Sequence, residues 1–157
     1  VVCHGCYDAP CQLKLSSPEG VSRGASKEIV YDGARFKTAD PTRLFIDAKT
    51  PEEWRAKGFH SVLNEGETTD RLANLNNSVM YKMLRLKQLN PQSRAGMLNS
   101  SFDLSLNRSQ SCPAPDEFDQ YARTFPNQGM PFGMPNLSDE EYRIMVQWLA
   151  QGAPVPD

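Results

Sequence analysis

The stretch Val1-Val2-Cys3-His4-Gly5-Cys6 at the start of the chain decides the fold prediction. A Cys-x-x-Cys-His motif attaches haem c, because its two thiols add to the two vinyl groups and its histidine becomes an iron ligand. The stretch from Val1 to His4 supplies the last four positions of that motif, and the first cysteine would lie immediately before Val1. We therefore expect Cys3 to anchor a haem and His4 to bind its iron.

A second indication of haem lies near the other end of the chain, in Gly129-Met130-Pro131-Phe132-Gly133-Met134-Pro135. A thioether held in a Pro/Gly-rich loop just before a C-terminal helix is how a mono-haem cytochrome c presents its second axial ligand. Met130 leaves seven residues before Ser138, enough for the loop to fold over the iron and return, whereas Met134 leaves three. We predict Met130 as the second iron ligand, with Met134 as the alternative. Neither binds if the iron keeps an open position for substrate.

The two ends of the chain also predict the fold class. A short helix or turn is expected at residues 6–15, and Ser138-Asp139-Glu140-Glu141 is a capping box that starts a C-terminal helix. In cytochromes c the two terminal helices cross over the haem. We therefore predict a mainly α, cytochrome c-like helical domain around one haem, with long loop insertions. This single domain would cover residues 1–157, with a helical and loop excursion at about 64–115.

Further helices are predicted between the two ends. Thr50-Pro51-Glu52-Glu53 is a capping box that starts a helix ended by Gly58. Apolar residues recur every three or four positions over 69–89, which predicts one helix capped by Thr68 or Thr69. A helix of one or two turns is expected at 116–124. Residues 16–20 are predicted as a loop, because proline and glycine there disfavour a continuing helix.

The helix predicted at 69–89 has two interpretations. Its residues Met80, Met83, Arg85 and Lys87 could form a membrane-surface face, apolar on one side and basic beside it. We favour a core stripe with a solvated flank, because polar residues dilute the first half of the helix.

Composition excludes several classes of function. The 157 residues fit one domain, and a hydrophobic content of 39% supplies a modest core. The net charge of −2 comes from 17 basic and 19 acidic residues and gives no basis for nucleic-acid binding.

No apolar run approaches the roughly 18 residues of a membrane span, so we predict no membrane span in this chain. A chain that begins inside a motif is expected to have lost what preceded it, so the absence of a signal peptide excludes nothing.

The four cysteines favour an oxidising compartment. If Cys3 takes the haem, Cys11 with Cys112 would close a long loop and Cys6 with Cys11 a short one. A longer closed loop gains more in the chain-entropy account, so we favour the disulfide between Cys11 and Cys112. A zinc site is the competing interpretation, because Cys3 and Cys6 also form a Cys-x-x-Cys pair. A structural zinc site usually needs a second such pair, which the chain does not offer.

Two arginines and one further histidine are additional candidates for the haem site. Arg35 and Arg43 could pair with haem propionates, because a guanidinium fork matches a carboxylate. His60 is the only histidine besides His4 and hence the sole candidate for bis-histidine ligation. A hydrogen-bonded structural role beside Phe59 suits His60 better.

Nine short stretches, spread over nearly the whole chain, carry a resemblance to one family. The first five are Val1-Val2-Cys3-His4-Gly5-Cys6-Tyr7-Asp8-Ala9-Pro10-Cys11-Gln12-Leu13, Arg23-Gly24-Ala25-Ser26-Lys27, Tyr31-Asp32-Gly33, Thr42-Arg43-Leu44-Phe45 and Lys57-Gly58-Phe59-His60-Ser61-Val62-Leu63. The other four are Leu106-Asn107-Arg108, Cys112-Pro113, Glu117-Phe118-Asp119 and Gly129-Met130-Pro131-Phe132. Together they resemble the haem-containing region of the bacterial periplasmic fatty-acid cis/trans isomerases.

The resemblance implies an enzyme that converts cis double bonds in membrane phospholipid acyl chains to trans, with haem c and without ATP or NAD(P)H. Trans chains pack more densely, so the isomerase would stiffen the membrane under stress. The resemblance places the protein in the periplasm and makes this chain the cytochrome-like part of a longer isomerase, whose remainder would be its partner. It also implies His4 and Met130 as catalytic iron ligands and Cys3 as the covalent anchor.

Two other functions stay open. A mono-haem c-type electron-transfer domain would use the same Cys3, His4 and Met130 but no lipid site. A haem-free secreted disulfide domain would be fully ordered without iron. The Ser/Asn-rich excursion at 91–115 and the helix that carries Met80 and Met83 favour the isomerase, because a lipid-binding enzyme could use them and an electron carrier does not require them.

Overall fold

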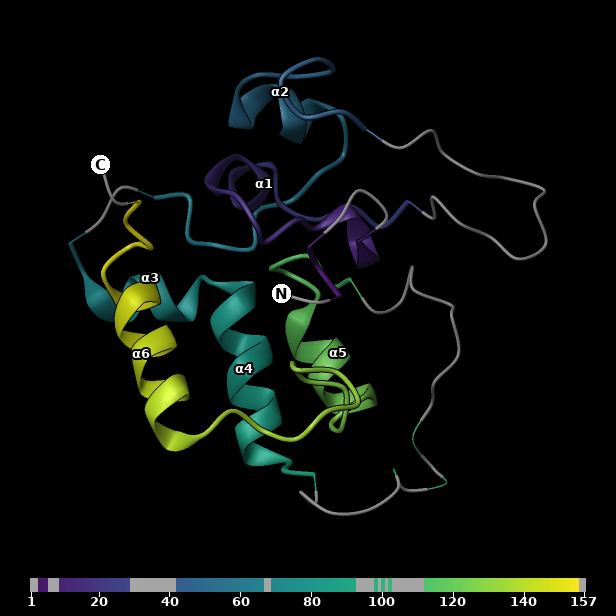
Figure 1. Ribbon diagram of the computed structural model, residues 1–157, viewed down its shortest axis with the longest axis vertical. Coiled ribbons are helices and arrows are strands. Elements are labelled where there is room, and N and C mark those ends of the chain that lie inside the picture. The colour runs from purple at the N-terminus through teal and green to yellow at the C-terminus, as the bar shows by residue number, and fades with distance from the viewer. Residues whose placement is uncertain are drawn as a thin grey trace. The chain divides into compact units, whose positions relative to one another are not determined.

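The computed structural model describes residues 3–5, 9–28, 42–66, 69–92, 98, 100, 102 and 112–155. Over these residues the protein is mainly helical, with the six helices α1 to α6, one short 3₁₀ helix η1 and two isolated β-bridges (Figure 1). The prediction of a mainly α protein is confirmed. A cytochrome c-like arrangement and a single domain stay predictions. No helix within the described ranges combines the length and apolarity needed to cross a bilayer.

The chain divides into two compact units, each of which is described by itself. Unit 1 comprises Val1–Val62 and Asn107–Ala114. It contains η1 (Pro10–Gln12), α1 (Pro18–Arg23) and α2 (Pro51–Ala56). Unit 2 comprises Leu63–Leu106 and Pro115–Asp157. It contains α3 (Arg71–Asn76), α4 (Val79–Leu89), α5 (Phe118–Thr124) and α6 (Asp139–Ala150).

Helix α1 corrects the prediction of a loop at residues 16–20. The Ser17 side chain caps the helix by accepting from the Gly20 amide at 3.2 Å. Pro18 occupies the first turn, where a missing amide hydrogen costs nothing. Gly20 is required by a close approach, because a Cβ there would collide with the Lys14 carbonyl oxygen. Proline disfavours a helix interior, but Pro18 is the first residue of α1 and therefore begins the helix.

Helix α2 begins at the predicted capping box. The Thr50 side chain accepts from the Glu53 amide at 3.3 Å, and the Glu53 carboxylate accepts from the Thr50 amide at 3.2 Å. Trp54 is buried behind this cap and packs edge-on against Phe59, with ring centroids 5.2 Å apart. Ala48 completes this small core of unit 1, which is covered on one side by Leu44.

Arg23 is a buried cation at the centre of unit 1. Its side chain is 3% exposed, and its guanidinium carbon lies 5.7 Å and 5.4 Å from the ring centroids of Trp54 and Phe59. Its Nη1 donates to the Thr42 carbonyl at 3.3 Å and to the Thr42 hydroxyl at 3.1 Å, and its Nη2 donates to the Gln12 carbonyl. Cation–π attraction of this kind strengthens when the charge is removed from water. Arg23 thereby joins η1, α1 and α2.

The disulfide predicted between Cys11 and Cys112 is present. It joins residues 101 positions apart and holds Cys112, which is buried, in unit 1. Cys6 lies outside the described residues. The disulfide therefore connects η1 with the end of the excursion predicted at 91–115.

The single helix predicted over 69–89 is wrong, because the chain forms α3 and α4 there with a break at Ser78. The Ser78 side chain accepts from the Tyr81 amide at 3.2 Å and so caps α4. Asp70, rather than Thr69, caps α3 by accepting from the Leu72 and Ala73 amides. Serine and aspartate favour such caps over helix interiors, since their side chains compete for backbone amides.

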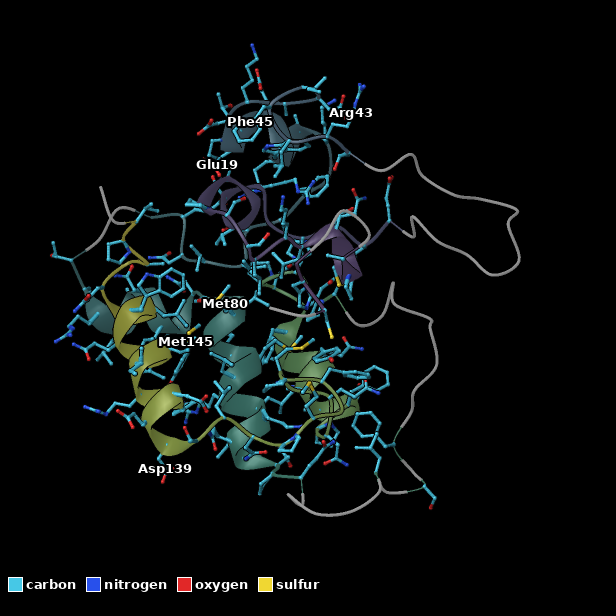
Figure 2. The ribbon with its side chains drawn as sticks, viewed as in Figure 1. Glu19, Arg43, Phe45, Met80, Asp139 and Met145 are labelled. Carbon is cyan, nitrogen blue, oxygen red and sulfur yellow. A yellow bond between two sulfur atoms is a disulfide. The ribbon has the colours of Figure 1, made fainter. Side chains whose placement is uncertain are left out.

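Helix α4 packs apolar side chains on two sides. One cluster with α5 consists of Val79, Met83, Leu86, Phe118 and Tyr121, with Ala122, Phe125 and Met130 packed against it. The other centres on Leu84, Leu149 and Ala153 and includes Met80 of α4 and Met145 of α6, both marked in Figure 2. The core-stripe interpretation is confirmed over α4, and the membrane-surface alternative is wrong, because Met80 and Met83 face the interior. Leu72 of α3, which the same stripe included, is 69% exposed.

Helix α6 begins as predicted. The Ser138 side chain accepts from the Glu141 amide at 3.3 Å, and the Glu141 carboxylate accepts from the Ser138 amide at 2.8 Å. The helix presents Tyr142, Met145, Trp148 and Leu149 to the second cluster. Gly152 follows its end with a φ of 85°, a conformation that glycine adopts without strain.

Candidate functional site

His4 is held in a defined orientation within unit 1. Its side chain is half-buried, and its Nδ1 lies 2.9 Å from the Leu13 carbonyl oxygen. Because a carbonyl can only accept, Nδ1 carries the hydrogen and donates it. The neutral ring then has its lone pair on Nε2. Metal-binding histidines in proteins are oriented by the same type of bond from the other ring nitrogen.

Backbone contacts keep His4 beside the segment that follows η1. The Leu15 amide donates to the His4 carbonyl at 2.8 Å, and the Ser16 hydroxyl donates to the Gly5 carbonyl at 3.1 Å. Cys3 precedes this paired stretch and carries an exposed free thiol. The predicted anchor is thus accessible to a vinyl group, while the predicted ligand is fixed by its neighbours.

The loop that carries Met130 is fastened to α4. The Met130 amide donates to the Met83 carbonyl at 3.1 Å, and the Met130 side chain packs on the cluster that contains Met83. Gly129 lies flat against α4, because a Cβ there would be 2.8 Å from the Met83 oxygen and 2.9 Å from the Lys87 Cα. A residue larger than glycine would push Met130 away from the helix.

Two further contacts set the path of the loop. The Tyr121 hydroxyl donates to the Gln128 carbonyl at 2.8 Å, and burial raises the pKa of Tyr121 to about 12, so the phenol keeps its hydrogen at neutral pH. At the other end, Asn136 accepts from the Gln92 amide at 3.3 Å and donates to the Gln88 side chain at 3.3 Å. The loop is therefore held at both ends by α4 and α5 and their flanks.

The two candidate methionines differ in their surroundings. Met130 is half-buried against the α4–α5 cluster, whereas Met134 is 53% exposed. Between them, Phe132 lies against Phe102 with ring centroids 5.1 Å apart. An interior position agrees better with an axial ligand than an exposed one, so Met130 remains our prediction.

Arg43 forms an ion pair with Asp47. Its Nη2 and Nε donate to the Asp47 Oδ1 at 2.7 Å and 3.2 Å, and its backbone amide donates to Oδ2 at 2.7 Å. These bonds hold the pKa of Asp47 below its usual value. A propionate would have to compete with this carboxylate for Arg43. Arg35 lies outside the described residues.

The structure also describes residues of the two alternative metal sites. The His60 amide and carbonyl pair with those of Ala25 at 2.8 Å and 2.9 Å, which forms an isolated bridge in unit 1. A zinc site loses Cys11 and Cys112 as ligands, because they are joined in the disulfide. Over the described part of the chain, no three His, Cys, Asp or Glu side chains gather as a metal site.

Lys87 is the residue of this region that the sequence analysis placed wrongly. The sequence indicates a place for it on the basic flank of the helix, but its side chain is 1% exposed and its Nζ has no hydrogen-bond partner among the described residues. Burial lowers the pKa of Lys87. Its position four residues after Met83 places it on the core-facing side of α4, and that spacing was the available signal.

The described residues fit a haem iron in chemical type. Imidazole and thioether are the axial ligands of c-type cytochromes, and a free thiol beside the imidazole suits a covalent anchor. His4 belongs to unit 1 and Met130 to unit 2, and each is positioned by contacts inside its own unit.

Comparison with known families gives a match over most of the chain. The sequence model of a family described as fatty acid cis/trans isomerase (CTI) matches residues 39–157. The match begins after the Cys3-His4 stretch and includes α2 to α6 and the Met130 loop. Neither the curated proteins nor the solved structures provide a match.

Proposed function

Because the chain belongs to the fatty acid cis/trans isomerase family, we propose that it isomerises cis double bonds of membrane phospholipid acyl chains with the help of a bound haem c. The proteins of this family are described as isomerases of fatty acids. Isomerisation leaves the composition of the lipid unchanged, so the proposed reaction consumes neither ATP nor NAD(P)H. The haem, the phospholipid form of the substrate and the periplasmic location are the parts that we add.

The observation that carries the haem proposal is the hydrogen bond from His4 Nδ1 to the Leu13 carbonyl. It keeps the lone pair on Nε2 and makes that nitrogen a stronger donor to a metal. The adjacent exposed thiol of Cys3 is the second support, because the two residues occupy the last positions of a haem-attachment motif.

Each proposed site residue has its own role. His4 would be the permanent axial ligand and Cys3 the covalent anchor. Met130 would be the weaker ligand, retained or displaced during the reaction, and its thioether raises the reduction potential of the iron. Arg43 would contact a propionate only by exchanging its bonds with Asp47.

When bound, the ferric haem would supply an electron-poor centre that withdraws density from the double bond, so that the bond rotates and the density returns without net oxidation. The chain's own contribution is to hold His4 and Met130. Leu13 orients the imidazole, and Met83 holds the loop that carries the thioether. Loss of either contact would weaken the binding of that ligand to the iron without removing its donor atom.

A loop of unit 1 supports a membrane lipid as the substrate. Phe45 and Ile46 are 63% and 65% exposed, and Figure 2 shows Phe45 and Arg43 at the same end of this unit. Phe45 has a φ of 68°, a strained conformation for an aromatic residue. The Arg43–Asp47 pair and the bridge between Leu44 and Ala48 close the turn that holds it. Two adjacent apolar side chains on a closed turn suit insertion among lipid headgroups.

The disulfide between Cys11 and Cys112 supports the periplasmic location. Such bonds persist in oxidising compartments and are rare in the cytosol. We propose that the remainder of a longer isomerase chain accompanies this part there, as the resemblance implies.

The test is expression with the native upstream residues and the haem-maturation machinery, followed by absorption spectra and an assay on vesicles of cis-unsaturated phospholipid. We expect a c-type reduced spectrum and the appearance of trans acyl chains with ferric but not ferrous protein. His4→Ala should abolish both the c-type spectrum and the activity, whereas His60→Ala, the matched control, should keep the spectrum.

Three results would contradict parts of the proposal. A protein without haem would remove the haem chemistry. Equal isomerisation rates in the ferric and ferrous forms would remove the electron-withdrawing role. A haem protein that exchanges electrons but never isomerises vesicle lipid would favour the electron-transfer domain instead.

A further inference from the structure

The ammonium of Lys87 is a buried polar group of unit 2. The side chain is 1% exposed, and its Nζ has no hydrogen-bond partner in the part of the chain that the structure describes. A buried cation without a partner is strongly disfavoured, because it loses hydration and gains no compensating bond. A lysine at the surface would keep its ammonium hydrated, but the Lys87 ammonium is buried and has lost this water.

Lys87 lies where the proposed axial ligand is attached to α4. Gly129 sits directly on the Lys87 backbone, because a Cβ there would collide with the Lys87 nitrogen and lie 2.9 Å from its Cα. The next residue, Met130, is bonded to Met83, one helical turn before Lys87. The backbones of Lys87 and of the Met130 loop are therefore in contact inside unit 2.

A group bound to the Met130 thioether would bring more than its iron to this place. Haem carries two propionate carboxylates on the same rigid ring as the iron, so ligation at Met130 also fixes where the carboxylates can lie. A carboxylate is the ordinary partner of a buried lysine. The nearby described cation Arg85 is exposed and has no need of such a partner.

We infer that Lys87 Nζ binds a carboxylate of a ligand held beside the Met130 loop. The inference rests on the proposed function for its first source, a haem propionate. A free fatty acid, which carries the same group, is the second source. Burial lowers the pKa of Lys87 in the absence of a partner, and a bound carboxylate would offset this effect. Lys87 would thus take the role that the sequence predicts for Arg35 and Arg43.

The first arm of the test uses the haem-loaded protein. Lys87→Met keeps the length of the side chain and removes its charge, and Lys87→Gln is a second variant in case the first does not fold. Arg85→Met removes the same charge from an exposed position of α4. The readouts are the iron midpoint potential and the propionate bending mode in resonance Raman spectra.

A propionate partner predicts a lower midpoint potential in both Lys87 variants, because a nearby cation favours the ferrous form. The ferrous-to-ferric ratio at a fixed ambient potential should fall by roughly threefold or more, the scale of one buried charge interaction. The propionate mode should shift as well. Arg85→Met should change neither readout, since its charge is solvated and screened.

The second arm uses oleate and methyl oleate in neutral detergent micelles, with binding followed by tryptophan fluorescence. A fatty-acid partner predicts that Lys87→Met weakens oleate binding several-fold and leaves methyl oleate binding unchanged. If the Lys87 variants match Arg85→Met in both arms, the inference is overturned and Lys87 is a neutral core residue. If the wild-type protein holds no haem, the proposed haem chemistry fails, and the oleate arm alone decides the role of Lys87.

Discussion

The amide of Met130 donates to the carbonyl of Met83 at 3.1 Å, so the methionine loop is bonded to the middle of α4. A carbonyl inside a helix normally accepts from the amide four residues later. Here it also accepts from Met130, which lies 47 positions later in the chain. This bond makes the position of a proposed iron ligand depend on helix packing.

Gly129→Ala should displace the loop from α4. The new Cβ would collide with the Lys87 nitrogen and lie 2.8 Å from the Met83 oxygen, and backbone atoms cannot give way easily. We expect a loss of about 1–3 kcal/mol in the free energy of unfolding, as for other overpacked sites. Denaturant titration measures it. Gly66→Ala is the control, because its nearest neighbour would lie 3.6 Å away, and equal midpoints for the two variants would contradict the prediction.

Met130→Ala should abolish the weak long-wavelength methionine band of the ferric haem protein, and Met134→Ala should keep it. The reason is that Met130 is packed against the α4–α5 cluster, while Met134 is 53% exposed. Absorption spectra of the two variants provide the measurement. Loss of the band in Met134→Ala alone would assign the ligand to Met134 instead.

Asn74→Ala should destabilise unit 2. The Asn74 side chain is 4% exposed, and its Nδ2 donates to the Ala150 carbonyl at the end of α6 at 3.1 Å, while its Oδ1 accepts from Asn64 at 3.0 Å. Removing it leaves a buried carbonyl without its donor, at a cost of about 1–3 kcal/mol. Asn76→Ala changes an exposed residue of the same helix and should stay within about 0.5 kcal/mol of wild type. Thermal unfolding compares them, and similar transitions for both would refute the role of Asn74.

Acidification should weaken α6 through Glu141. The bonds from Ser138 lower the pKa of Glu141 below 4.5, so the ionised carboxylate favours the folded state. This contribution is complete above that ordinary value and is lost as the pH falls through the folded-state pKa. Glu141→Gln should therefore lose less stability than wild type on acidification below pH 4.5. Glu140→Gln removes the same charge outside the capping box and should follow wild type; parallel acid profiles for both variants would argue against the cap.

Replacing Phe45 and Ile46 together by serine should reduce binding to anionic phospholipid vesicles. These two residues are 63% and 65% exposed on one turn, so burial of their apolar side chains among the lipid headgroups favours binding. Vesicle cosedimentation should show a several-fold loss. Leu89→Ser removes another residue that is 68% exposed, and an equal loss there would mean that binding is not specific to the turn.

The elements that could be predicted depend on residues close together in the sequence. Both capping boxes, at Thr50 and Ser138, start helices as expected, because a side chain three residues from a free amide is sufficient to form them. The same local logic failed where one signal had two meanings. Pro18 can end a helix or begin one, and only its position after a capping serine decides between them.

The sequence by itself determined the family resemblance, the mainly helical content and the candidates His4, Cys3 and Met130, because a ligand motif needs only residue types and spacing. Tertiary structure alone decided which groups meet across the chain. It paired His4 with Leu13 and buried Lys87 without a partner. Burial and pairing depend on packing between distant segments, whereas local sequence rules extend over only a few residues.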